Sequence, residues 1–159
     1  MSTEVEDESR NTGHVLGTQL FMEARLSPGS SFQAASFLVA LRQEIFISFL
    51  TRRGLACTLD DCFIQRDVSP TDDWTWAHRM IVHTADILTS CYGPNPLTAY
   101  RWKQLKDYAD KWNIAKPSSF QPLFCSLDVE ETFPKLWYAN DCHGSSAFVS
   151  LAIYLLTYL

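Results

Sequence analysis

Three long stretches of the chain carry apolar side chains at helical spacing, and glycine and proline separate them. They cover residues 32–53, about 73–92 and about 97–115. The third has the clearest apolar face, formed by Trp102, Leu105, Ala109 and Trp112. No alternating apolar pattern of the kind typical of a β-strand reaches a useful length. We therefore predict an all-α fold with about four main helices, the last beginning near Pro134, because proline suits a first helical position.

Local residues place the ends of these helices. Gly54 is a candidate stop for the first helix, because glycine readily adopts the left-handed conformation beyond a helix end. The sequence SPTDD at 69–73 supplies residues that cap helix N-termini. Gly93 and the following PNP end the second helix. The third should stop before Lys116 and Pro117, since proline disfavours helical conformation in the residue before it.

The chain divides by composition into a polar beginning and an apolar body. Residues 1–12 hold four acids and one arginine, so they carry −3 of the net charge of −5. Clustered acids with little apolar surface cannot offset the entropy lost on ordering. We therefore expect 1–30 to be a flexible acidic and polar tail, with 1–12 dispensable for the fold. We expect 31–159 to be one helical domain, which fits the usual domain size.

Charge and hydropathy argue against nucleic acids and membranes as direct partners. An almost neutral body offers neither the basic surface expected of a DNA- or RNA-binding protein nor a polybasic membrane patch. The longest apolar run, residues 147–159, is 13 residues long and too short to span a bilayer. As a helix it would be apolar around most of its circumference, so we expect it to leave a patch that drives self-association.

Five cysteines are present, and their spacing argues against a metal site. Four residues separate Cys57 from Cys62, which resembles half of a zinc site, but no second pair of cysteine or histidine follows at finger-like spacing. The odd number and the scattered positions are typical of thiols in a reducing compartment. We therefore predict neither a metal nor a cofactor.

The sequence SFLVALRQEIFISFL at 36–50 places Arg42 and Glu44 inside an apolar run. Helical geometry predicts one apolar face, formed by Ala34, Leu38, Leu41, Ile45 and Phe49. A second apolar face would contain Val39, Phe46 and Leu50. Arg42 falls between the two faces and Glu44 on the far side, so the two cannot pair with each other. Each buried charge would therefore need a partner from another segment.

The second helix offers partners along one edge. Its predicted apolar stripe is Trp76, Met80, Ile87 and Cys91, and a polar seam of Arg79, His83 and Asp86 lies beside it. One hypothesis is catalytic: His83 and Asp86 act as an acid–base dyad while Arg79 binds an anionic substrate. The other is a structural polar network of Arg42, Glu44, Arg79, His83 and Asp86. We favour the structural network, because no nucleophile lies in a recognisable elbow.

Two further expectations concern Arg42 and the polar residues at 140–146. Arg42 should be buried and should pair with Asp86 or Asp141. The sequence NDCHGSS at 140–146 suggests a Cys142–His143 nucleophile, but adjacent residues of a helix point about 100° apart. A buried polar patch at this position is the preferred interpretation.

Four blocks of the sequence, in this order, carry a family resemblance: LRQEIFISFLTRRGL, DDWTWAHRMIVHTADILTSCYG, RWKQLKDYADKWNIAKPSSFQPLF and FPKLWYANDCHGSSA. They resemble the regulatory region of fungal zinc-cluster transcription factors, most closely the ARCA-like subgroup. The resemblance covers about residues 32–158. It implies an all-helical domain of a nuclear regulator of transcription, which acts through contacts with other proteins of the transcription machinery or as a homo-oligomer, and which senses an effector.

The sequence departs from this family at its DNA-reading module. No pair of C-x-x-C half-sites with a basic stretch is present, so no DNA-binding residue can be assigned and DNA would be reached only indirectly. The domain is also expected to be truncated at its C-terminal end. The resemblance therefore predicts a non-enzymatic regulatory domain. The alternatives are a small α-helical enzyme that uses Arg79, His83 and Asp86, or a truncated product with no function.

Overall fold

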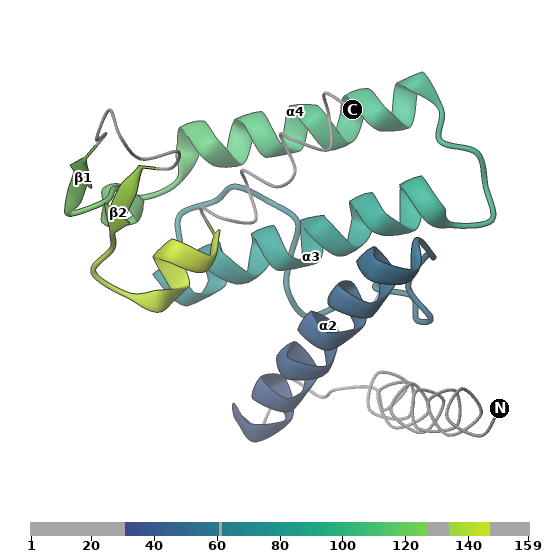
Figure 1. Ribbon diagram of the computed structural model, residues 1–159, viewed down its shortest axis with the longest axis horizontal. Coiled ribbons are helices and arrows are strands. Elements are labelled where there is room, and N and C mark those ends of the chain that lie inside the picture. The colour runs from purple at the N-terminus through teal and green to yellow at the C-terminus, as the bar shows by residue number, and fades with distance from the viewer. Residues whose placement is uncertain (1–30, 61, 127–133, 147–159) are drawn as a thin grey trace, which may run out of the picture. The chain divides into compact units, whose positions relative to one another are not determined.

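The computed structural model describes residues 31–60, 62–126 and 134–146. Its elements, in chain order and with the labels of Figure 1, are α2 (Ser31–Thr51), α3 (Asp73–Tyr92), α4 (Ala99–Ala115), the short 3-10 helix η1 (Ser118–Phe120), β1 (Phe124–Ser126) and β2 (Lys135–Trp137). The chain is predominantly helical, which confirms the predicted fold class. The predicted tail 1–30 and the apolar run 147–159 lie outside the described residues, so both expectations stay predictions.

The chain folds into two compact units, which we describe separately. Of the described residues, the first unit contains 31–60, 62–63 and 85–96, and the second contains 64–84, 97–126 and 134–146. The boundary falls within α3, so this helix contributes its first twelve residues to the second unit and its remaining residues to the first. The predicted single domain 31–159 stays a prediction.

In the first unit, α2 ends at Thr51, two residues before the predicted end at residue 53. Arg52 adopts the left-handed conformation, with a φ of 51°. The amides of Arg52 and Arg53 donate to the carbonyls of Phe49 and Ser48, the pattern of a Schellman motif. Gly54 has a different role: its amide donates to the Tyr92 carbonyl at 3.0 Å.

Backbone atoms lie where a side chain on Gly54 or on Gly93 would have to fit. A Cβ on Gly54 would lie 3.1 Å from the Gly93 Cα. A Cβ on Gly93 would collide with the carbonyl oxygen of Thr89. The two glycines therefore join the turn after α2 to the end of α3 within the first unit.

The buried face of α2 is rotated relative to the face that hydrophobic spacing predicted. Its buried residues are Phe37, Leu38, Leu41, Glu44 and Ser48. Phe49, placed on the buried face by the prediction, is 49% exposed. The rotation places Glu44 on the buried face, where partners from the following loop neutralise its charge. The predicted second apolar face of Val39, Phe46 and Leu50 is exposed.

In the second unit, α3 begins at the predicted cap. Asp72 accepts a hydrogen bond from the Thr75 amide at 2.9 Å and another from the Thr75 hydroxyl at 2.8 Å. These hydrogen bonds, the amide first, lower the pKa of Asp72. Of the predicted apolar stripe of α3, Trp76, Met80 and Ile87 are buried, whereas Cys91 is exposed near the helix end.

The first part of α3 runs beside α4 (Figure 1), and two tryptophans join them. The Trp112 Nε1–H donates to the Trp76 carbonyl at 3.1 Å, and the two rings meet edge to face with centroids 6.0 Å apart. Leu105 and Ala109 are buried on the same face of α4, as predicted, and Trp102 is half-buried. Thr98 caps α4 by accepting from the Arg101 amide, and the helix ends before Pro117 as expected.

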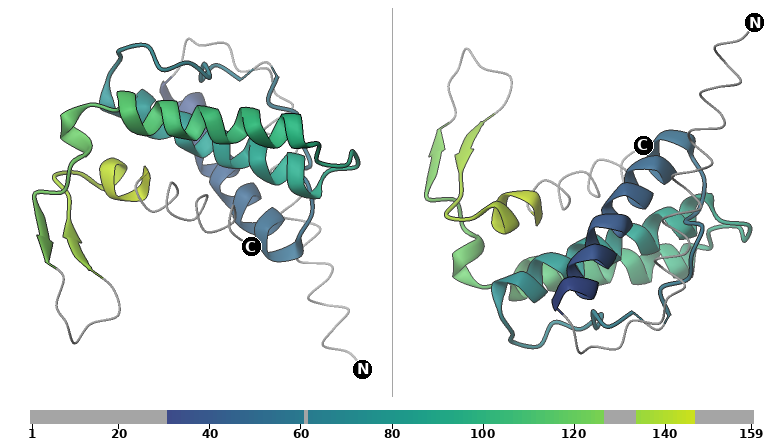
Figure 2. Two further views of the ribbon diagram at one scale, coloured as in Figure 1. Left: turned by 90° about the horizontal axis from the view of Figure 1, so that it is seen from above. Right: turned by 90° about the horizontal axis from the view of Figure 1, so that it is seen from below.

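The segment around Pro134 is not the start of a helix, contrary to the prediction. Residues 135–137 form β2, which pairs antiparallel with β1 in the register Phe124–Trp137, Cys125–Leu136 and Ser126–Lys135. The helical conformation begins only at Asp141 and is described to Ser146. Strands of three residues are too short to show alternation in the sequence. Figure 2 shows this two-stranded sheet projecting away from α4.

Candidate functional site

Glu44 forms the centre of a polar cluster in the first unit. Its side chain is 2% exposed, and its Oε1 accepts from Arg53 Nη1 at 2.7 Å and from the Ala56 amide at 2.8 Å. Its Oε2 accepts from Arg53 Nη2 at 3.2 Å, so the guanidinium contacts both carboxylate oxygens. Glu44 thus pairs with the loop directly after α2, whereas we had expected a partner on the second helix.

Opposing effects act on the pKa of Glu44. Burial alone would raise it, because a desolvated carboxylate is unfavourable. Hydrogen bonds from Arg53 and the Ala56 amide, together with the positive charge of Arg53, outweigh burial and lower the pKa. Glu44 is therefore held as a carboxylate inside the first unit.

Arg42 is exposed, which corrects the expectation that it is buried. Its Nη1 lies 3.5 Å from the Leu38 carbonyl of its own helix. The physical reason is the rotation of α2: Arg42 borders Val39 and Phe46, and these side chains are 55% and 63% exposed. The ion pair of Arg42 with Asp86 or Asp141 stays a prediction.

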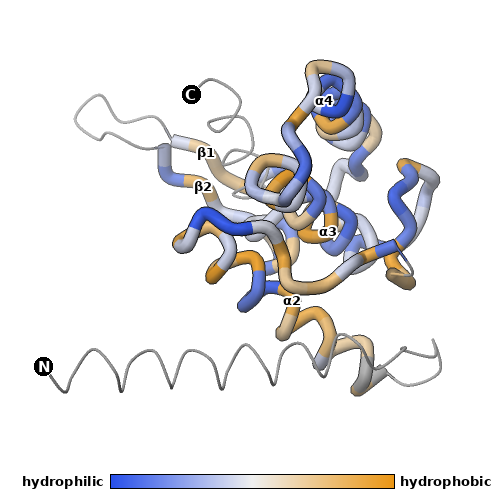
Figure 3. Tube along the Cα trace, turned by 90° about the vertical axis from the view of Figure 1, so that its right-hand side faces the viewer, coloured by the Kyte–Doolittle hydropathy of each residue, from blue (hydrophilic) through white to orange (hydrophobic). Residues whose placement is uncertain are grey.

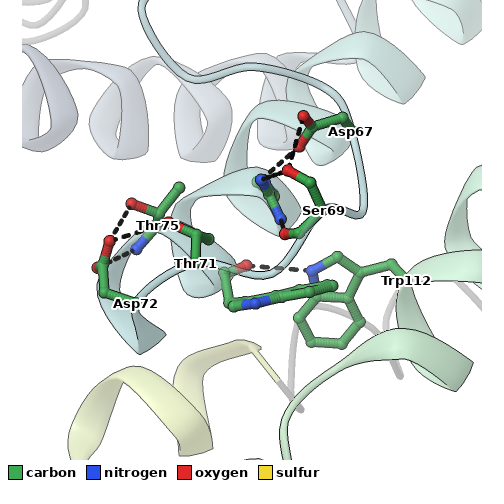
Figure 4. A network of polar contacts seen from close by, with 8 residues as sticks. Asp67, Ser69, Thr71, Asp72, Thr75 and Trp112 are labelled. Carbon is green, nitrogen blue, oxygen red and sulfur yellow. Dashed lines mark hydrogen bonds and ion pairs between the residues drawn. The ribbon is translucent and has the colours of Figure 1, made fainter.

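Arg79 forms a second polar cluster, in the second unit. Its side chain is 3% exposed, and its Nη1 and Nη2 donate to the carbonyl and the hydroxyl of Ser69 at 2.8 and 3.2 Å. Nη2 also forms an ion pair with Asp67. Figure 4 shows Asp67 and Ser69 side by side in this cluster. Its guanidinium carbon lies 4.8 Å from the centre of the Trp76 ring. The loop before α3 therefore neutralises Arg79, for which the sequence had suggested contacts between helices.

His83 and Asp86 complete the predicted set. His83 is 2% exposed, and its ring lies against Tyr108 of α4 with centroids 4.6 Å apart. Asp86 is half-buried and belongs to the first unit, whereas Arg79 and His83 belong to the second. Arg79 and His83 are thus buried in helix packing. Whether the five residues act as one structural network stays a prediction.

A third polar cluster could not be anticipated from the sequence. Asp73, at the start of α3, accepts from the Ser119 hydroxyl at 2.9 Å, and its other oxygen lies 2.9 Å from His143 Nε2. His143 is 4% exposed, and Phe120 packs against its ring. The cluster ties η1 and the helical residues 141–146 to α3. Because Ser119 and His143 lie 46 and 70 positions from Asp73, no local spacing could have revealed it. The predicted buried polar patch is present at His143.

The five cysteines, all within the described residues, are thiols and form no disulfides. Within residues 31–60, 62–126 and 134–146, no group of three or more histidine, cysteine or acidic side chains could hold a metal ion. Cys57 lies near Glu44. Burial first, and then the negative charge of Glu44, raise the pKa of Cys57 from 9.0 to about 11.

The raised pKa predicts slow alkylation of Cys57. At pH 8 its thiolate should be about 100-fold scarcer than that of an ordinary thiol, and higher nucleophilicity offsets part of this, so iodoacetamide should react about tenfold more slowly. Cys125 is exposed and should react first. Peptide mapping by mass spectrometry over a time course measures both rates. Unfolding the protein in urea should make them similar; equal rates in the folded protein would contradict the prediction.

An apolar stripe along α2, defined by Phe32, Val39, Phe46, Phe49 and Leu50, is the largest exposed feature of this helix. Their exposed fractions range from 49% for Phe49 to 78% for Phe32. Three of them follow at intervals of seven residues, so they lie on one side of the helix. Figure 3 shows hydrophobic residues along much of α2. Single exposed apolar residues are common, but a continuous row on one helix is typical of a binding surface.

By length and composition alone, residues 34–51 of α2 would also be apolar enough to cross a membrane. The core helix of a soluble protein can have the same length and composition.

These features define a predominantly helical protein, in which loops next to the helices neutralise the buried charges of Glu44 and Arg79. No protein-family model, curated protein or solved structure matches the chain. The resemblance to the regulatory region of fungal transcription factors therefore stays a prediction.

Proposed function

We propose that this chain is a regulatory or interaction domain that takes part in the regulation of transcription by binding other proteins. The four sequence blocks that resemble the fungal regulatory region suggest this class. The proposed setting is the nucleus, with DNA reached only through a partner. A net charge of −5 accords with this, because a protein that binds DNA directly needs a basic surface.

The observation that carries the proposal is the apolar stripe of α2. An apolar helix face is a common docking site for a helix of another protein, which contacts it with side chains at the same spacing. The opposite face of α2 is buried, so the helix is held in the first unit while the stripe remains available.

The buried seam of α3 favours a binding domain over the alternative enzyme. A substrate-binding arginine must reach its substrate, yet Arg79 is 3% exposed and is already bonded to Ser69 and Asp67. His83 is 2% exposed, whereas an acid–base catalyst must lie within hydrogen-bond reach of the reacting group. Both side chains serve packing better than catalysis.

A tethering experiment tests the proposed function. Residues 1–159 are fused to a DNA-binding module of known sequence specificity, and transcription of a reporter carrying its site is measured in yeast. We expect the reporter level to change at least about threefold relative to the module alone, because a bound partner protein alters the recruitment of the transcription machinery to the reporter. Phe46→Asp should abolish this change, since a charge in the stripe opposes apolar docking.

Gln104→Asp is the matched control. It adds the same charge at an exposed polar position of α4, so it should leave the reporter level unchanged. Protein amounts are compared by immunoblot. A reporter that does not respond to the fusion, or that responds equally with Phe46→Asp, would contradict the proposal.

A further inference from the structure

We infer that the apolar stripe of α2 binds an acidic amphipathic helix of a partner protein. The inference rests on the proposed function, because it names the chemistry of the partner that the same surface would recruit. Two observations carry it: the helical spacing of the exposed apolar residues and the charge of the surface around them.

The spacing of the stripe fits a helix. Phe32, Val39 and Phe46 recur every seven residues, and Phe49 follows Phe46 by three. Intervals of seven and three or four are those at which one helix contacts another along its length. A partner in extended conformation would instead need unpaired backbone groups on α2 to bond with. The backbone groups of α2 are already used in its own helical hydrogen bonds.

The exposed charged side chains that α2 itself carries are positive. α2 contains one acid, Glu44, which is buried and neutralised by Arg53. The exposed charged side chains of α2 and its C-terminal turn are Arg42 and Arg52. Acidic residues that flank the apolar face of a partner helix would complement these arginines, and complementary charge orients and selects partners.

The same charges disfavour two other occupants. In a second copy of this chain, docked through the same stripe, arginines would face arginines or the positive N-terminal end of α2. An anionic membrane would attract the arginines, but it would also repel a chain whose net charge is −5. A single acidic helix touches only the local surface of α2, where the exposed charge is positive.

Binding of two synthetic peptides to the full chain tests the inference. Both are fluorescein-labelled helices of about 20 residues with leucines at helical spacing. In one peptide all the remaining positions are glutamate, and in its twin they are lysine. Fluorescence anisotropy measures each affinity at low and high salt. The charge of the whole chain favours the lysine peptide, whereas the local surface of α2 favours the glutamate peptide.

We expect the glutamate peptide to bind at least about tenfold more tightly than its lysine twin, and to weaken as salt screens the charges. Phe46→Asp should reduce its affinity at least about tenfold, because the leucines lose an apolar contact. Arg52→Gln should weaken it about threefold, while Arg52→Lys, which keeps the charge, should not. Circular dichroism verifies that each variant is folded.

Four results from the purified chain would overturn the inference. These are equal or tighter binding of the lysine peptide, and glutamate-peptide binding that Phe46→Asp leaves unchanged. The third is a dimer in light scattering that Phe46→Asp abolishes, with no peptide bound. The fourth is stripe-dependent sedimentation with phosphatidylglycerol vesicles in place of peptide binding. A stripe-dependent reporter without peptide binding would remove this inference alone; peptide binding with an unresponsive reporter would remove the proposed function alone.

Discussion

Replacing Trp112 with alanine should lower the free energy of unfolding by about 4 kcal/mol, the typical cost of deleting a buried tryptophan ring. Trp112 is 1% exposed and contacts two other rings, with centroids 6.0 Å from Trp76 and 5.8 Å from Phe120. Figure 4 shows its indole aimed at a carbonyl oxygen of the neighbouring helix. Alanine would leave a cavity between α3, α4 and η1 and remove this hydrogen bond.

Trp112→Phe, compared with Trp112→Ala, separates the contribution of the ring from that of the hydrogen bond. Trp112→Phe keeps a ring but removes the Nε1–H donor to the Trp76 carbonyl, so it should cost about 1–2 kcal/mol. Trp102→Ala is the control on the same helix. Because Trp102 is only half-buried, this change should cost clearly less than Trp112→Ala. Urea unfolding followed by circular dichroism measures each value. A loss for Trp112→Ala no larger than that for Trp102→Ala would contradict this account of the core.

Helix existence could be predicted from the sequence because it depends on local physics. Apolar spacing identified α2, α3 and α4, and residues at their ends, such as Asp72 and Pro117, placed the boundaries within a few positions. Leu105, Ala109 and Trp112 are buried as their spacing predicted. In these segments, periodicity and capping chemistry agree on the same structure.

The hairpin of β1 and β2 could not be predicted, because its formation does not depend on local sequence alone. Three-residue strands carry almost no periodic signal, and Pro134 favours the start of a helix when it is considered alone. Pairing of β1 with β2 depends on two segments that meet across residues 127–133. No property of either segment by itself indicates that contact.

The polar clusters show where pattern analysis fails more generally. Hydrophobic spacing treats Glu44 as a residue to expose, so it rotates the predicted face of α2 away from it. A hydrogen-bonded partner reverses that preference, because a paired carboxylate can be buried whereas an unpaired one cannot. Arg53 and the Ala56 amide supply that partner from beyond the helix end. The contact of Asp73 with His143 depends on the tertiary fold, across 70 positions.

Replacing Glu44 with alanine should lower the free energy of unfolding by about 3 kcal/mol at pH 7, because its buried carboxylate accepts three hydrogen bonds that alanine cannot accept. The substitution leaves the Ala56 amide without its carboxylate acceptor and removes the partner of Arg53, whose side chain is 33% exposed. Glu44→Gln keeps the shape and an acceptor oxygen but loses the charge, so it should cost about half as much. Arg42→Ala, an exposed change on the same helix, should cost less than about 1 kcal/mol.

The contribution of Glu44 to stability should depend on pH, whereas a contribution from packing alone would not. The pKa of Glu44 is lowered in the folded protein from its usual 4.5, so the folded state favours the carboxylate. Its contribution to stability is therefore complete above pH 4.5 and is lost as the pH falls through the lowered value. Glutamine does not titrate, so the stability difference between wild type and Glu44→Gln should be largest near pH 7 and should shrink below pH 4.5. Urea unfolding at several pH values measures this difference. A difference that stays constant into the acid range would show that the Glu44 carboxylate contributes by its shape and not by its charge.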